Sequence, residues 1–197
     1  TAPHLSEKGV PGEEVFLELE LKLVADVGLL GFPNAGKSTF LSVVTQARPK
    51  IADYPFSTLT PNLGVATAAG KTFVIADIPG LIEGAHTGKG LGDEFLRHVE
   101  RTRVLIHLVD VFGFDGKTAA QNLKALNKEL ASHSKRLAAT PQIVVATKMD
   151  LTGADTALAG LRRLFRKAKS YPLSSATGKG VKELMGAVVK ALQTAPE

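Results

Sequence analysis

The residues with the clearest chemical signature lie at positions 31–38, where the sequence is Gly-Phe-Pro-Asn-Ala-Gly-Lys-Ser. They match the pattern G-x-x-x-x-G-K-[ST], in which a loop turns its backbone N–H groups inward around an anion. Gly36 lets the backbone approach a phosphate closely, Lys37 supplies a point charge for the β- and γ-phosphates, and Ser38 offers a hydroxyl to Mg²⁺. The pattern therefore predicts a site for the phosphates of a nucleotide. Its expected contacts are Gly31, Phe32, Pro33, Asn34, Ala35, Gly36, Lys37, Ser38 and Thr39.

A glycine turn between a strand and a helix could have the same residue pattern without binding a ligand. The neighbouring segments oppose that interpretation. Residues 23–30 form a mostly apolar run, which is typical of a strand covered on both faces. Residues 39–46 have the pattern of a helix, which would start near Lys37 and turn its positive dipole end toward the anion.

A second candidate site, for a metal ion, lies at the end of the apolar run 72–77, whose last residue is Asp77. An acid at such a strand end holds Mg²⁺, usually through water, and the N–H of Gly80 would face the γ-phosphate. Asp-x-Pro-Gly alone is a common turn signal, but its place after the phosphate loop and inside a predicted hairpin favours the metal site. The expected contacts of this segment are Asp77, Ile78, Pro79 and Gly80.

The segment 48–61 has no clear period and is predicted to be a long loop, and loops of that length in compact domains are usually functional. Thr58 can reach Mg²⁺ with its hydroxyl and the γ-phosphate with its N–H. Such contacts exist only while the γ-phosphate is present, so the loop would act as a switch. Ser57 and Thr60 are alternatives for this role. The expected contacts are Phe56, Ser57, Thr58, Leu59 and Thr60.

A base-binding segment is predicted where the apolar run 143–146 leads into Thr-Lys-Met-Asp. The carboxylate of Asp150 can accept hydrogen bonds from the ring N–H and the amine of guanine, whereas adenine would leave the acid unpaired. The stem of Lys148 can lie over the flat base, and the N–H of Ala176 can reach the guanine oxygen. The alternative is an ATP site, and the presence of Asp150 argues against it. The expected contacts are Thr147, Lys148, Met149, Asp150, Ser175, Ala176 and Thr177.

The elements that must position these residues alternate between strands and helices, which predicts an α/β fold with a mainly parallel sheet flanked by helices on both faces. A hairpin is expected around residues 69–71. The other expected strands are 104–111, 143–146 and 171–174, and the other expected helices are 93–102, 118–137, 156–169 and 181–193.

The composition narrows the function classes. The chain has 197 residues, of which 44% are apolar and 22% charged, with a net charge of +5. It has no cysteine, which excludes a disulfide framework, a thiolate zinc site and a cysteine nucleophile. No apolar run is long enough for a membrane span, and no signal peptide is expected. A basic stretch could contact RNA or simply form a solvated helix face; it comprises Arg162, Arg163, Arg166, Lys167 and Lys169.

Together these segments resemble the Obg family of GTPases. The stretches that carry the resemblance are 19–28, 31–38, 51–59, 77–86 and 95–103. The resemblance implies a Ras-like fold, slow hydrolysis of GTP to GDP and phosphate with Mg²⁺, and a switch role in assembling the large ribosomal subunit on its rRNA. It also implies a monomer in the bacterial cytoplasm or an organelle, with guanosine tetraphosphate as a candidate regulator. Residues 1–22 would be the tail of a glycine-rich N-terminal domain, and residues 23–197 the GTP-binding domain.

By the same resemblance, the metal ligands are Ser38, Thr58 and Asp77, and Lys37, Thr58, Gly80 and Asn34 take part in catalysis. The chain departs from the family at Thr147, where Asn is usual and where a hydroxyl would replace part of the bracing by the amide. Many GTPases orient the attacking water with Gln at the position of Leu81, so turnover is expected to be slow. Asn34 would help to hold K⁺ in place of an arginine finger. A nucleotide sensor whose output is partner binding is the alternative function.

Overall fold

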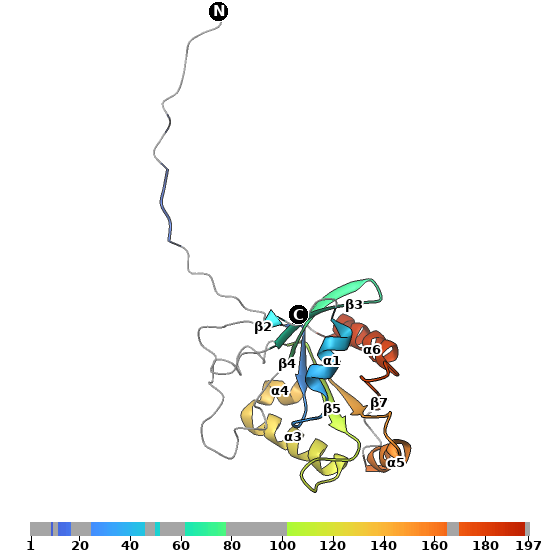
Figure 1. Ribbon diagram of the computed structural model, residues 1–197. Helices are drawn as coiled ribbons and strands as arrows, with labels where there is room; N and C mark the ends of the chain where they lie inside the picture. Colours follow the sequence, from blue (N-terminus) through green and yellow to red (C-terminus); the bar gives the residue numbers. More distant parts are fainter. Residues whose placement is uncertain are drawn as a thin grey trace, which may run out of the picture.

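A mainly parallel sheet forms the centre of the computed structural model, which describes residues 9, 12–16, 25–45, 50–51, 62–77, 102–164 and 170–195 (Figure 1). In this part of the chain the sheet has seven strands in the order β2-β3-β4-β1-β5-β6-β7. The strands are β1 Val27–Leu30, β2 Lys50–Ile51, β3 Asn62–Ala68, β4 Lys71–Asp77, β5 Val104–Asp110, β6 Gln142–Thr147 and β7 Ser170–Pro172. The helices are α1 Lys37–Val44, α3 Ala119–His133, α4 Lys135–Ala139, α5 Ala154–Leu164 and α6 Val181–Thr194.

The pairing of the strands confirms the predicted α/β class. β4, β1, β5, β6 and β7 are parallel neighbours, whereas β3 pairs antiparallel with β4, and β2 antiparallel with β3. The predicted hairpin is formed by β3 and β4. Its two turn residues, Ala69 and Gly70, have φ values of 48° and 73°, and positive values at both positions match the twist of a tight hairpin.

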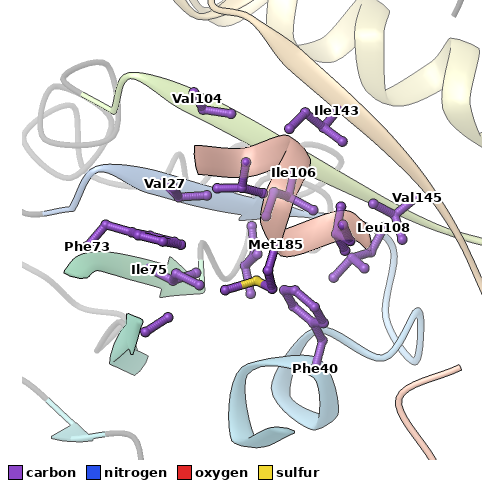
Figure 2. Close-up of a cluster of buried hydrophobic side chains, with 14 of the residues drawn as sticks. Val27, Phe40, Phe73, Ile75, Val104, Ile106, Leu108, Ile143, Val145 and Met185 are labelled. Carbon is purple, nitrogen blue, oxygen red and sulfur yellow. The ribbon is translucent and has the colours of Figure 1, made fainter. Parts of the chain in front are cut away.

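Helices cover both faces of the sheet because its strands are apolar on both sides. On one face, Phe40 of α1 and Met185 of α6 pack against Val27, Ile106 and Val145 of the central strands (Figure 2). On the other face, α3 and α5 contribute a second cluster. Its members include Leu123, Leu158, Val109, Val144 and Ala146. The three-layer arrangement leaves the ends of the parallel strands accessible to loops.

Several predicted boundaries differ from those of the structure. The expected helix 118–137 is two helices, because the side chain of Ser134 accepts a hydrogen bond from the N–H of Leu137 and starts α4 after α3 has ended. α1 begins at Lys37, where the start of the helix was expected, although the helical pattern itself was placed from residue 39. The short strand β2 lies inside the segment that was predicted to be a loop, where it pairs with the start of β3.

Several predictions concern residues outside the described part of the chain. They are the switch-loop contacts Phe56, Ser57, Thr58, Leu59 and Thr60, the contacts Ile78, Pro79 and Gly80, the position of Leu81, the helix 93–102, and the basic residues Arg166, Lys167 and Lys169. Within the described residues, no helix combines the length and apolar character needed to cross a bilayer.

Candidate functional site

The predicted phosphate and base segments meet at one edge of the sheet. β1, β4, β5 and β6 are parallel, so their carboxyl ends lie on the same side of the sheet. These ends are Leu30, Asp77, Asp110 and Thr147. Ligands of open α/β sheets bind at the carboxyl ends of the strands. The fold therefore places the candidate residues together, although they lie far apart in the sequence.

The glycines of the phosphate loop are required for two different reasons. A Cβ atom on Gly31 would lie 2.6 Å from the carbonyl oxygen of Leu108 in β5, so the loop can pass close to the sheet only without a side chain there. Gly36 has no such neighbour, but its φ of 92° is one that other residues rarely adopt. Gly36 is also the N-cap of α1, so this backbone turn directs the start of the helix toward the loop.

Lys37 closes the loop with its own side chain. Its ammonium donates to the carbonyl oxygens of Gly31 and Phe32, with Nζ–O distances of 2.8 and 3.3 Å. The first turn of α1 contains no acidic residue, so nothing in that turn neutralises the positive end of the helix dipole. The loop therefore joins a free helix N-terminus to a nearby cation, which is the electrostatic arrangement that favours a polyphosphate.

Ser38 and Asp77 form the candidate metal site. The Ser38 hydroxyl donates to Oδ2 of Asp77 over 3.4 Å, and Asp77 is only 5% exposed at the end of β4. Both side chains offer hard oxygen ligands, which suit Mg²⁺. Among the described residues there is no group of three or more His, Cys, Asp or Glu that could hold a metal. Two protein ligands would suffice for Mg²⁺, because this ion usually keeps several waters and takes oxygens from phosphates.

Asp150 is held in place by a residue that sequence reasoning did not select. The buried Ser174 hydroxyl donates to Oδ1 of Asp150 over 2.7 Å and accepts from the N–H of Thr177 over 3.2 Å. This hydrogen bond is the main cause that lowers the pKa of Asp150, so the carboxylate stays ionised. The signal available in the sequence was a serine at the end of the predicted strand 171–174, one position before the predicted contact Ser175.

The turn after β7 carries the remaining predicted base contacts. Ser175, Ala176 and Thr177 form this turn, which is closed by a hydrogen bond from the N–H of Gly178 to the carbonyl of Ser174. The N–H of Met149 donates to the carbonyl of Leu173 and ties the turn to the base segment. The two segments predicted to contact the base are therefore brought together.

Within the part of the chain that the structure describes, Thr147 does not provide the expected bracing. Its side chain is 3% exposed, and within the described residues its hydroxyl has no hydrogen-bond partner. The next residue, Lys148, has a left-handed backbone with a φ of 61°. Its ammonium forms an ion pair with Asp110, which sequence reasoning also missed. Bracing of the base segment thus comes from Ser174 and Asp110 rather than from Thr147.

A separate cavity of about 650 Å³ lies between α1, the β3–β4 turn and α6. Neither residues 31–38 nor residues 147–150 line it. The cavity shares Gly178 with the turn after β7.

Known proteins resemble this chain over most of its length. A family model described as a 50S ribosome-binding GTPase matches residues 26–148. "GTPase Obg" of Desulforudis audaxviator is 58% identical over 99% of the chain, and that of Elusimicrobium minutum is 54% identical over all of it. The chain spans 46% and 43% of the lengths of these relatives.

Solved structures support the fold at lower identity. The G domain of the Thermotoga maritima FeoB iron transporter matches with a TM-score of 0.59 and 22% identity, covering 84% of this chain and 96% of that one. Aquifex aeolicus Era bound to GDP and AlF₄⁻ matches with a TM-score of 0.61 and 22% identity, covering 90% and 58%. At this identity the likeness concerns the fold alone.

Proposed function

The chain belongs to the Obg family of GTPases, and on that premise we propose that it binds GTP and GDP with Mg²⁺ and hydrolyses GTP to GDP and phosphate. The observation that carries this proposal is the meeting of the phosphate loop, the Ser38–Asp77 pair and the braced Asp150 at one edge of the sheet. The loop would bind the phosphates, the Ser38–Asp77 pair would bind Mg²⁺, and Asp150 would accept hydrogen bonds from the base.

In this proposal the phosphates are held by the backbone N–H groups of the loop and the start of α1, and Lys37 exchanges its loop carbonyls for phosphate oxygens. Ser38, Asp77 and Thr58 would hold Mg²⁺, which supplies neutralisation of charge on the β- and γ-phosphates. The N–H groups of Thr58 and Gly80 would contact the γ-phosphate. With Leu81 at the position that usually orients water, the intrinsic rate would be slow.

Selectivity for guanine would come from Asp150. The hydrogen bond from Ser174 lowers the pKa of Asp150, so the carboxylate is ionised at neutral pH. An ionised carboxylate can accept hydrogen bonds but cannot donate one. Guanine presents two donors on the edge that would face this acid. Adenine would leave this charged acceptor without a donor, which costs about 3 kcal/mol or more.

The proposed cellular role is a switch in the assembly of the large ribosomal subunit in the bacterial cytoplasm or in an organelle, with the chain acting as a monomer. Family membership and the description of the matching family model support it. Residues 1–22 would be the end of a glycine-rich domain, residues 23–197 the GTP-binding domain, and guanosine tetraphosphate a further ligand. Of the basic stretch, Arg162 and Arg163 are exposed on α5, and Arg162 also bonds to Ser170.

The proposal is tested by measuring the affinity for GTP, GDP and ATP with Mg²⁺ and with EDTA. We expect tight binding of both guanine nucleotides, at least a hundredfold preference over ATP, and weaker GTP binding in EDTA. Equal affinity for ATP would contradict it. Multiple-turnover phosphate release with and without large ribosomal subunits then separates a GTPase switch from a nucleotide sensor, because a sensor would show little turnover in either condition.

A further inference from the structure

Asp110 occupies a fixed position between the two halves of the candidate site. It is the last residue of β5, and its register partner in β6 is Thr147, the first residue of the base motif. Its Oδ1 accepts a hydrogen bond from the N–H of Phe112 over 3.0 Å, and its carbonyl accepts one from Gly113. One carboxylate oxygen is thereby fixed by the turn that follows the strand, which leaves the other with a defined direction.

That second oxygen holds Lys148. The distance between Oδ2 of Asp110 and Nζ of Lys148 is 2.6 Å, and the side chains are 13% and 37% exposed. Lys148 follows β6, whereas Asp110 ends β5, so the stem of the lysine crosses from one strand end to the next. A sheltered carboxylate attracts an ammonium more strongly than an exposed one does, because salt and water screen it less.

The segment after Asp110 also reaches the phosphate loop. The ring of Phe114 lies against that of Phe32, with centroids 5.6 Å apart and planes inclined by 33°. Phe114 is itself fixed by two backbone hydrogen bonds with Lys117, each 3.1 Å long. The short segment 110–114 therefore contacts the base motif at one end and the phosphate loop at the other.

We propose that Asp110 is a positioning residue for purine binding, acting through Lys148. By fixing the ammonium above the end of β5, it holds the lysine stem as a flat apolar support for one face of the base. This inference rests on the proposed function, since it assigns a role in the same nucleotide site. Asp150 would select the edge of guanine, whereas Asp110 would set the strength of the contact with its face.

The test compares the equilibrium affinities of the whole chain for GDP and for inosine diphosphate. Inosine diphosphate has the same flat face but lacks the exocyclic amine. Asp110→Asn keeps an oxygen that can accept from Phe112 but removes the charge that holds Lys148. We expect both affinities to fall roughly tenfold and their ratio to stay unchanged. Asp110→Glu, which retains the charge, should recover part of the loss.

The matched control is Asp115→Asn, which removes an exposed acid from the same loop at a left-handed position that Asn tolerates. Its affinities should equal those of the unmodified chain. In a Lys148→Met background, which keeps the stem without the ammonium, Asp110→Asn should cause no further loss, because the charge that it would hold is already gone.

Two results would overturn the inference alone. The first is an unchanged GDP affinity in Asp110→Asn while the unmodified chain still prefers GDP over ADP. The second is that Asp110→Asn lowers the GDP affinity in the Lys148→Met background as much as it does in the unmodified chain. If the unmodified chain showed no preference for GDP over ADP, the proposed function would fail together with the inference.

Discussion

The hydroxyl of Ser174 donates a 2.7 Å hydrogen bond to the carboxylate of Asp150 and joins the turn after β7 to the base motif after β6. The same hydroxyl accepts from the N–H of Thr177. Ser174 is therefore both an acceptor for its own turn and a donor to the acid. The same hydrogen bond thus fixes the position of the Asp150 carboxylate and lowers its pKa.

Ser174→Ala should weaken GDP binding several-fold, because the carboxylate loses its fixed direction. The substitution should also raise the pKa of Asp150, since the lost hydrogen bond is the main cause of its lowering. Affinity depends on the ionised acid, so it should begin to fall at a higher pH in the variant as the solution is acidified. Fluorescence titration with labelled GDP from about pH 6 down to about pH 3 measures this, because the ordinary pKa of an aspartate lies near the lower end of this range. Ser132→Ala, at an exposed position of α3, is the control. Superimposable pH profiles would contradict the assignment.

Ser38→Ala should remove most of the benefit that Mg²⁺ gives to GTP binding, because one of the two described oxygen ligands is lost. Affinity in EDTA should change little. Ser42→Ala, one turn further along α1 and exposed, is the matched control and should retain the response. Isothermal titration with and without Mg²⁺ distinguishes the two. An equal Mg²⁺ response in both variants would exclude Ser38 as a ligand.

Asn34→Gly tests the proposed K⁺ site. Asn34 has a left-handed φ of 60°, which glycine also adopts, so the change removes the amide without straining the loop. The unmodified chain should release phosphate faster in KCl than in NaCl, and the variant should lose this difference. Equal rates of the unmodified chain in the two salts would eliminate a role for K⁺.

His107 should make the fold sensitive to acid. It is buried in β5, within the described residues its Nδ1 has no hydrogen-bond partner, and burial lowers its pKa to about 3. Unfolded histidine takes up a proton near pH 6.5, so the folded state loses stability as the pH falls from about 6.5 toward 3, by roughly 2 kcal/mol at pH 5.

In His107→Leu this part of the pH dependence should disappear, because the group that titrates is absent. Urea unfolding at pH 7 and pH 5 gives the comparison. A variant with the same loss between the two pH values as the unmodified chain would show that another group is responsible.

The class of fold and the phosphate loop could be predicted because their signals are local. An apolar run, a glycine pattern and a helical pattern follow each other over residues 23–46, and the structure has β1, the loop and α1 in that order. The hairpin was equally local, since its turn joins two adjacent strands. Boundaries set by single caps were missed, as at Ser134, whose backbone N–H bonds to the last turn of α3 and whose side chain begins α4.

The bracing of the base motif could not be predicted because it depends on tertiary contacts. Asp110 and Lys148 are brought together by the pairing of β5 with β6, and Ser174 reaches Asp150 only through β7. Nothing in the sequence around Asp110 distinguishes it from other acidic residues at the ends of strands. The hydroxyl of Thr147 was expected to brace the loop, but its place on a buried strand end leaves it without a hydrogen-bond partner among the described residues.

The most direct measurement is the affinity of Lys37→Ala for GDP and GTP, beside Lys179→Ala as an exposed lysine control. Lys37 already bonds to two carbonyls of the phosphate loop, so its ammonium stands where the phosphates are proposed to bind. We predict that Lys37→Ala binds both nucleotides at least roughly a hundredfold more weakly and that the control is unchanged. Undiminished affinity in a folded Lys37→Ala protein would contradict the proposed site.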